Sequence, residues 1–191
     1  MVRGPSENEI VSLYDASFYE DETTVARESA EATLPIIFSL IPVHTVIDIG
    51  CGTGAWVAET QKLGCVAIGV DHHVPIEMLC IPGNTYIDCD LTNGWPCGGY
   101  DLAICLEVAE HLPEESAIPL INGLTRATSV LFSAATPGQQ GVGHINCQPH
   151  TYWHDLFLTR GFDWIHVGPT LPEVVADFYR RNAFLYQKAE S

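Results

Sequence analysis

A glycine-rich turn between a short strand and a helix constrains this 191-residue chain more than any other feature. Thr45–Ile49 is a β-branched run, and residues 55–63 have the composition of a helix. Gly50, Gly52 and Gly54 lie between them. Small residues in such a turn let the backbone approach a ligand, and the N-terminus of the following helix favours negative charge. The segment therefore predicts a strand, a ligand-binding turn and a helix in succession.

The alternation of strands and helices continues along the chain. Helices are expected at residues 22–40 and 113–126, with Pro35 kinking or ending the first one early and Pro119 bending the second. The strand-like runs show little polar alternation, which is typical of a sheet covered on both faces. We therefore expect a doubly wound sheet with its ligand at the carboxyl ends of the strands. Further strands are predicted at residues 65–70, 85–87, 102–106, 130–134, 164–167 and 183–186.

Composition limits the classes of partner. Eight Lys plus Arg against 24 Asp plus Glu give a formal net charge of -16, so the average surface repels nucleic-acid backbones and anionic lipid. The sequence holds no run of 18 apolar residues and no apolar signal-peptide core, so we expect neither a membrane partner nor secretion. The seven cysteines are an odd number without Cys-x-x-Cys spacing, which indicates buried thiols in a reducing cytoplasm.

Asp48 narrows the choice of ligand. The pattern Gly50-x-Gly52-x-x-Ala55 also satisfies a relaxed dinucleotide motif, so a nicotinamide-dependent oxidoreductase stays open as an alternative. A carboxylate two residues before the first glycine would repel a pyrophosphate but would attract a cationic amino group. S-adenosylmethionine carries such an amino group.

With this aspartate included, the stretch Asp48-Ile-Gly-Cys-Gly-Thr-Gly-Ala-Trp56 closely resembles motif I of class I S-adenosylmethionine-dependent methyltransferases. The segments Glu107-Val-Ala-Glu-His-Leu-Pro113 and Gly143-His-Ile-Asn146, followed by Tyr152-Trp153, are similar to those of a bacterial subgroup of small methyltransferases. The resemblance implies a Rossmann-like, mainly parallel seven-stranded sheet with helices on both faces, formed by residues 1–191 as one domain. It also implies S-adenosylmethionine as the cofactor.

The resemblance also implies which residues bind the cofactor. An acidic residue at the end of the second strand holds the ribose hydroxyls in that family, and Asp71 fits this role, while His72 could cover the adenine ring. Asp90 and Leu91 fit the adenine-binding segment, although aspartate is also common in plain turns. The full expected set is Asp48, Gly50, Cys51, Gly52, Gly54, Asp71, His72, Asp90, Leu91 and Glu107.

Methyl transfer needs alignment above all, and it needs a base only where the acceptor keeps its proton. His111 and His144 follow the fourth and fifth predicted strands and are the expected general bases, with a purely structural role left open. A divalent metal is possible but not favoured. Its candidate ligands are Glu107, Glu110, His111 and His144, whose spacing is similar to that of some metal-using methyltransferases.

The sequence thus predicts a methyltransferase that acts on oxygen or nitrogen of a small-molecule acceptor. Residues 1–40 are expected to form a helical lid or cap, beginning with a short helix after the capping box Ser6-Glu-Asn-Glu9. A non-catalytic S-adenosylmethionine-binding regulatory module is the second alternative. The oligomeric state and the acceptor are left undetermined.

Overall fold

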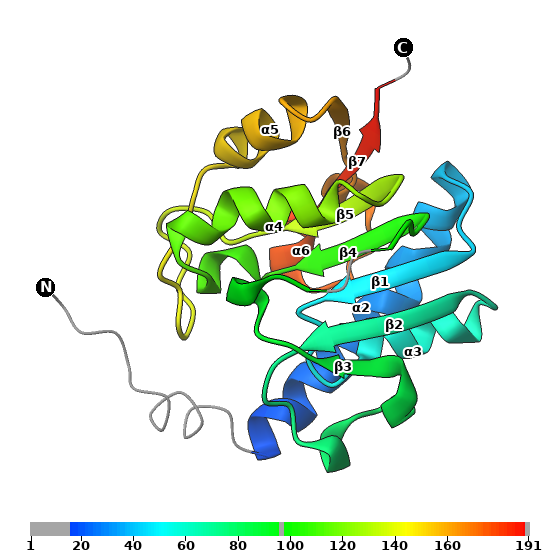
Figure 1. The fold of residues 1–191 in the computed structure, drawn as a ribbon. Helices are drawn as coiled ribbons and strands as arrows, with labels where there is room; N and C mark the ends of the chain where they lie inside the picture. Colours follow the sequence, from blue (N-terminus) through cyan, green and yellow to red (C-terminus); the bar gives the residue numbers. More distant parts are fainter. Residues whose placement is uncertain (1–15, 96–97, 190–191) are drawn as a thin grey trace, which may run out of the picture.

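The computed structural model describes residues 16–95 and 98–189, which build a single seven-stranded sheet with helices on both faces (Figure 1). The strand order is β3-β2-β1-β4-β5-β7-β6, and β7 alone runs in the direction opposite to the other six strands. This confirms the predicted fold class. The strands are β1 (Thr45–Ile49), β2 (Val66–Asp71), β3 (Tyr86–Asp88), β4 (Leu102–Leu106), β5 (Ser129–Ser133), β6 (Phe162–His166) and β7 (Phe184–Lys188).

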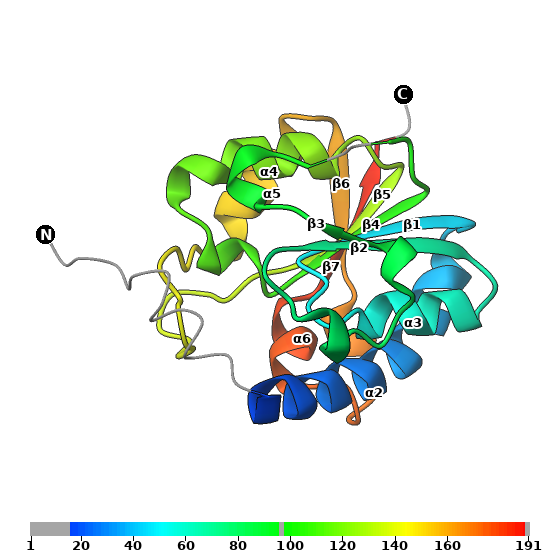
Figure 2. The same ribbon diagram turned by 60° about the horizontal axis from the view of Figure 1, so that its bottom comes forward.

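Two helical layers cover the sheet. Helices α2 (Ala16–Leu40), α3 (Ala55–Lys62) and α6 (Asp177–Asn182) lie on one face, and α4 (Ala117–Leu124) and α5 (His150–Leu158) lie on the other (Figure 2). The strands supply both cores by alternation, since Val46 and Ile104 pack towards the first layer and Ile47 and Cys105 towards the second. This double coverage explains the continuous apolar strand runs.

The topology sets the place of the site. The chain builds β1, β2 and β3 outward in one direction and then returns to place β4 on the other side of β1. Ligands of open parallel sheets bind at such a switch point, outside the carboxyl ends of the strands. In Figure 1 these ends and the loops that follow them lie on the left.

Both helical prolines lie within helices that continue past them. Helix α2 does not end at Pro35 but continues to Leu40, because Leu34 and Ile37 on either side are fully buried in the core while Pro35 itself is exposed. Burial of those two side chains outweighs the lost hydrogen bond. Pro119 lies in the first turn of α4, where backbone N–H groups have no intrahelical acceptor, so it requires no bend.

Other expectations meet the structure only in part. Six cysteines lie within the described residues and all are free thiols, but only Cys51 and Cys105 are buried. The expectation of buried thiols is therefore wrong for the other four. Over residues 16–95 and 98–189, no helix is long and apolar enough to cross a membrane. The helix expected after Ser6 lies outside the described residues.

Candidate functional site

The glycine turn joins β1 to α3 and is fastened to β2. The backbone N–H groups of Gly50 and Cys51 both donate to the carbonyl of Val70, at 2.8 and 3.2 Å. Gly50 has a φ of +76°, and a Cβ on it would lie 2.3 Å from Cγ2 of Val108. Gly52 also has a positive φ, but a Cβ there would meet nothing within 4 Å. The first glycine is therefore required by packing, whereas the second borders open space.

Asp48 is a buried carboxyl group at the end of β1. The residue is 3% exposed, and its Oδ2 atom has no hydrogen-bond partner within the described structure. Burial, reinforced by the charge of Asp71, raises the pKa of Asp48 well above its usual range. A cationic group beside this oxygen would relieve both the desolvation and the missing hydrogen bond.

Asp71 ends β2, and both of its carboxylate oxygens accept backbone hydrogen bonds, one of them from the glycine turn. Oδ2 accepts from the N–H of Gly52 at 2.6 Å, and Oδ1 accepts from the N–H of His72 at 2.7 Å. Burial raises the pKa of Asp71, and these two hydrogen bonds oppose the rise. Each oxygen keeps a second lone pair, so the oriented carboxylate can still accept hydroxyl hydrogen bonds.

Asp88 ends β3 and holds the two histidines that follow β2. Asp88 contacts His72, with Oδ1 lying 2.9 Å from Nδ1, and it also accepts from the N–H of His73 at 3.2 Å. The His72 and His73 rings stack with centroids 3.5 Å apart. Asp88 was not among the expected site residues, although its register position opposite Asp71 brings it to the same edge of the sheet.

Asp90 is engaged in its own turn. Its Oδ1 accepts from the N–H and the hydroxyl of Thr92, at 2.9 and 2.7 Å, and Oδ2 accepts from Nδ2 of Asn93 at 2.8 Å. These hydrogen bonds lower the pKa of Asp90, with the Thr92 side chain as the first cause. Leu91 is buried in the core. The side chain of Asp90 thus has the turn role that the sequence left open as an alternative.

Glu107 follows β4 with a φ of +55°, which is unusual for a residue other than glycine. Its N–H donates to the carbonyl and the hydroxyl of Ser133, both at 3.1 Å. Its carboxylate accepts from Gln139 at 3.2 Å and from Nδ2 of Asn182 at 3.4 Å. Asn182 is buried and also lies 3.3 Å from Nε2 of His150. A polar network from three elements therefore fixes the carboxylate.

Sequence reasoning did not identify Gln139 and Asn182 as site residues. Asn182 lies 75 positions from Glu107 and belongs to α6, a short helix between β6 and β7. The one available signal was a polar residue directly before the apolar run of the final strand. That position brings α6 to the edge where β4 ends, because β7 returns antiparallel beside β5.

Glu110, His111 and His144 come together beside Glu107. One potential ligand atom from each of the three lies within 4.8 Å of the other two. The His111 and His144 ring centroids are 4.9 Å apart at an interplanar angle of 77°. Burial, and then the charge of Glu107, raises the pKa of Glu110 to about 8, while burial and then His144 lower the pKa of His111.

The loop after β5 is held in place by the backbone of Glu110. The carbonyl of this residue accepts from the N–H groups of Ile145 and Asn146, both at 2.9 Å. Asn146 is buried and its Nδ2 lies 3.4 Å from the carbonyl of Ala109. Backbone contacts between the two loops thus position His111 and His144, the two expected general bases, next to each other.

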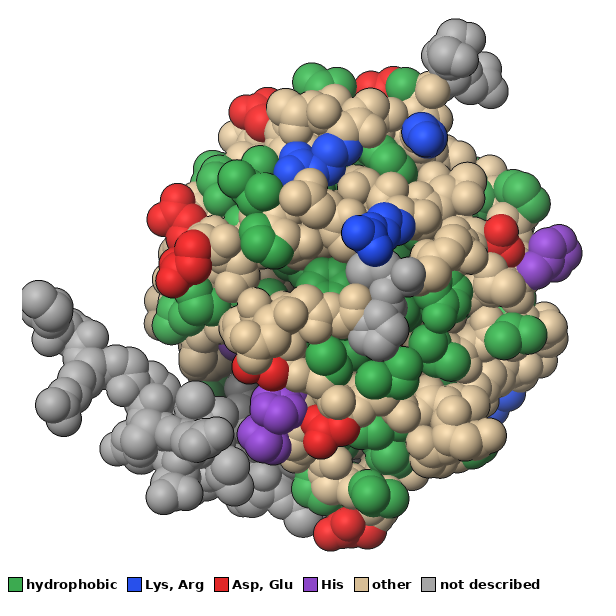
Figure 3. All heavy atoms as spheres, viewed as in Figure 1, with side chains coloured by type: hydrophobic (Ala, Val, Ile, Leu, Met, Phe, Trp, Pro, Cys, Tyr) green, Lys and Arg blue, Asp and Glu red, His purple; other side chains and the backbone are tan. Residues whose placement is uncertain are grey.

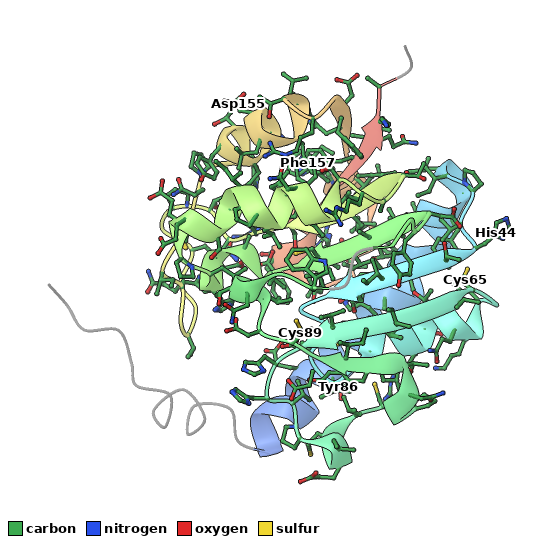
Figure 4. All side chains as sticks on the ribbon, in the orientation of Figure 1. His44, Cys65, Tyr86, Cys89, Asp155 and Phe157 are labelled. Carbon is green, nitrogen blue, oxygen red and sulfur yellow. The ribbon has the colours of Figure 1, made fainter. Side chains whose placement is uncertain are left out.

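Helix α2, at the start of the described chain, contacts the glycine turn at the carboxyl ends of the strands. The hydroxyl of Thr23, on α2, lies 2.7 Å from the hydroxyl of Thr53 in the glycine turn. The opposite edge of the sheet holds structural contacts, with Asp101 accepting from the N–H groups of His44 and Thr45 at 2.8 and 2.9 Å. Figure 4 shows His44 and Cys65 at that opposite edge, whereas Cys89 lies near the carboxyl ends of the strands.

Charge over the molecule is dominated by carboxylates. In the view of Figure 3, acidic side chains are scattered across the face, and Lys and Arg form only small groups. This agrees with the formal net charge of -16. Such a surface does not favour a polyanionic ligand.

Comparisons with known proteins give a consistent result. A family model described as a methyltransferase domain matches residues 19–121. No curated protein matches the chain. Among solved structures, an S-adenosylmethionine-dependent methyltransferase from Archaeoglobus fulgidus is similar with a TM-score of 0.62 and 20% identity, over 79% of this chain and 76% of that one.

Two further structures have the same fold. Magnesium protoporphyrin IX methyltransferase from Synechocystis PCC 6803, with bound S-adenosylhomocysteine, has a TM-score of 0.63 and 18% identity over 93% of this chain and 90% of that one. Human N-acetylserotonin methyltransferase, in complex with S-adenosylmethionine, has a TM-score of 0.64 and 16% identity. The alignment covers 98% of this chain but spans only 61% of the human one.

Proposed function

The chain belongs to the methyltransferase domain family, and from this premise we propose that it transfers a methyl group from S-adenosylmethionine to an oxygen or nitrogen atom of a small-molecule acceptor. The observation that supports this most strongly is the arrangement of Asp48, the glycine turn and Asp71 at the switch point of the sheet. The residues fit the cofactor in two respects. Asp48 has a buried oxygen without a partner, and Gly52 faces open space.

The roles of the cofactor-binding residues follow from their chemistry. Asp48 would hold the amino group of the cofactor, because a buried carboxylate needs a cationic partner. Asp71 would accept the ribose hydroxyls, and the backbone of the glycine turn would lie against the carboxypropyl part of the cofactor. His72, held by Asp88, would cover the adenine ring, with Asp90 and Leu91 at its edge. Cys51, Gly50 and Gly54 shape the turn.

The acceptor side of the site is proposed at the loops after β4 and β5. S-adenosylmethionine, when bound, supplies an electrophilic methyl carbon. The chain must align the acceptor with that carbon and handle the proton of the acceptor. His111 and His144 face each other at this edge and are the groups proposed for the proton, and Glu107 stands beside them in its fixed network. Oxygen is the preferred acceptor atom because two candidate bases flank the site.

A small molecule is favoured over a nucleic acid as the acceptor. The excess of 24 acidic over 8 basic residues opposes the approach of a phosphate backbone. The similar structures from Synechocystis PCC 6803 and from human are named for magnesium protoporphyrin IX and N-acetylserotonin, which are small molecules. The start of α2, which contacts the glycine turn through Thr23, is proposed to belong to a cap formed by residues 1–40.

Calorimetric titration with S-adenosylhomocysteine and, separately, with NAD tests the cofactor. We expect S-adenosylhomocysteine to bind and NAD not to bind, because a pyrophosphate would meet the carboxyl group of Asp48. Binding of NAD alone would favour an oxidoreductase and contradict the proposal. A screen for release of S-adenosylhomocysteine over hydroxyl and amine acceptors then tests catalysis. Cofactor binding without turnover on any acceptor would favour the regulatory module.

A further inference from the structure

The side chains of Glu110, His111 and His144 converge from two loops that the sequence separates by more than 30 residues. Glu110 and His111 belong to the single 3₁₀ turn Ala109–His111 after β4, and His144 belongs to the loop after β5. Their potential ligand atoms all lie within 4.8 Å of one another. A metal ion with bonds of about 2.1 Å holds its ligands at most about 4.2 Å apart, so small side-chain adjustments suffice.

The carboxyl group of Glu110 is a second, independent observation that indicates a ligand between Glu110, His111 and His144. The residue is fully buried, and its Oε1 accepts from the N–H of Ala135 at 2.9 Å. Its Oε2 has no hydrogen-bond partner in the described structure. A buried carboxyl oxygen without a partner is costly, and either a proton or a cation can satisfy it.

Both imidazoles have the supporting contacts that metal-bound histidines usually have. His144 places Nδ1 3.3 Å from the carbonyl of Gln139, and the backbone of Gly143 acts on His111 so as to oppose the lowering of its pKa by burial. A ring N–H donated to a carbonyl leaves the second nitrogen with a lone pair for a metal. The His144 ring lies directly over Gly141, where a Cβ would come within 2.1 Å of Nε2, so the loop is built to admit it.

We propose that Glu110, His111 and His144 form a binding site for one divalent transition-metal ion of the manganese-to-zinc series. Two imidazoles and one carboxylate suit these ions better than magnesium or calcium, which prefer oxygen ligands alone. Three protein ligands leave further coordination positions open. Glu107 is close enough for its charge to act on Glu110, but its carboxylate is held by Gln139 and Asn182 and lies outside the group of three.

The use of the metal rests on the proposed function, but its binding does not. A cation at this point lies beside Glu107 at the proposed acceptor side of the site. It would lower the pKa of an acceptor hydroxyl, which favours oxygen over nitrogen acceptors. In the metal-bound protein, His111 and His144 would hold the cation in place of acting as bases, and the proton of the acidified hydroxyl would pass to solvent water.

Cobalt binding to chelator-treated, tag-free protein tests the site without any acceptor. We expect calorimetry and visible absorption to show one Co²⁺ per chain, and Zn²⁺ or Mn²⁺ to compete while Mg²⁺ does not. Glu110→Gln and His144→Ala should each weaken binding by about tenfold or more. His44→Gln is the matched control, because this exposed histidine lies at the opposite edge of the sheet and should leave binding unchanged (Figure 4).

The same samples separate the two proposals. If Co²⁺ does not bind, or binds equally to wild type, Glu110→Gln and His144→Ala, the metal site is wrong even where S-adenosylhomocysteine binds normally. If S-adenosylhomocysteine does not bind but Co²⁺ binding depends on Glu110 and His144, the metal site stands and the proposed function is wrong. Retained S-adenosylhomocysteine binding and an unchanged melting temperature in Glu110→Gln would show that this variant is folded.

Discussion

Three carboxyl groups at one edge of the sheet differ in what surrounds them. Asp48 has an oxygen with no partner, Asp71 is held by two backbone N–H groups, and Glu110 combines one backbone hydrogen bond with one orphan oxygen. Burial raises the pKa of all three. A carboxylate whose oxygens accept hydrogen bonds from the protein is held in one orientation and can orient a ligand. A buried carboxyl group with an oxygen that lacks a hydrogen-bond partner either binds a cation or keeps a proton.

Replacing Asp71 by Ala should weaken binding of S-adenosylhomocysteine by about 10- to 100-fold, because two hydroxyl hydrogen bonds to a charged acceptor are lost. Calorimetric titration measures the change. Asp155→Ala on α5, which packs beside β6 at the other end of the strand order from β2, should bind like wild type. Equal affinities of the Asp71 variant and wild type would remove Asp71 from the cofactor site.

Gly50 and Gly52 form a matched pair for separating packing from ligand binding. Gly50→Ala places a Cβ against Val108 and should lower the free energy of unfolding by about 1–3 kcal/mol beyond the cost of a positive φ. Gly52→Ala should cost only about 1–2 kcal/mol for its φ, yet it should reduce cofactor affinity, since its Cβ enters the open space. Urea unfolding and calorimetry measure the two effects. Unimpaired cofactor binding by folded Gly52→Ala would contradict the assignment of that space.

At the scale of elements, tertiary packing overrides local helix signals. Helix α2 runs through Pro35 because its buried stripe, with Ala30, Leu34 and Ile37, continues on both sides of the proline. The folded protein is therefore less stable by the free energy of the backbone hydrogen bond that Pro35 cannot donate. Pro119 lies in the first turn of α4, where a backbone N–H has no acceptor within the helix, so this proline does not lower the stability in the same way.

Pro35→Ala should therefore raise the free energy of unfolding by about 2 kcal/mol, because a backbone hydrogen bond is restored on an exposed helix position. Pro119→Ala should change it by less than about 0.5 kcal/mol. Both values come from urea unfolding curves. An equal effect of the two substitutions would mean that the position of the proline in its helix does not decide the cost.

For the molecule as a whole, His154 couples stability to pH. Its ring stacks on Trp164 at 4.1 Å, and its Nδ1 lies 2.7 Å from the hydroxyl of Tyr186. Burial, and then the nearby His150, lower the pKa of His154 to about 4, with His166 acting in the same direction and Asp155 opposing. The unfolded chain thus takes up a proton below pH 6.5 that the folded protein accepts only near pH 4.

The contribution of His154 to stability is therefore complete above pH 6.5 and is lost as the pH falls from 6.5 towards 4. We expect the free energy of unfolding to fall less steeply over this window in His154→Asn than in wild type, because the asparagine can keep a contact to Tyr186 but cannot be protonated. Chemical unfolding at pH 7 and pH 5 gives the comparison. Parallel pH dependences of the two proteins would show that His154 does not titrate in this way.

The sequence by itself determined the seven strands in chain order, the helices α2, α3 and α4, and the glycine turn between β1 and α3. Periodicity and the glycine turn are local signals, and they sufficed for β1, α3 and β2 and for the neighbourhood of Asp48 and Asp71. Only the tertiary structure brought Asn182 and Gln139 to Glu107 and gathered Glu110, His111 and His144. Those contacts join segments far apart in the chain, and their geometry depends on the return of β7 beside β5 and on loop packing, which leave no local pattern. Sequence reasoning could name ligands for a metal but could not show that three of them converge around a buried oxygen without a partner.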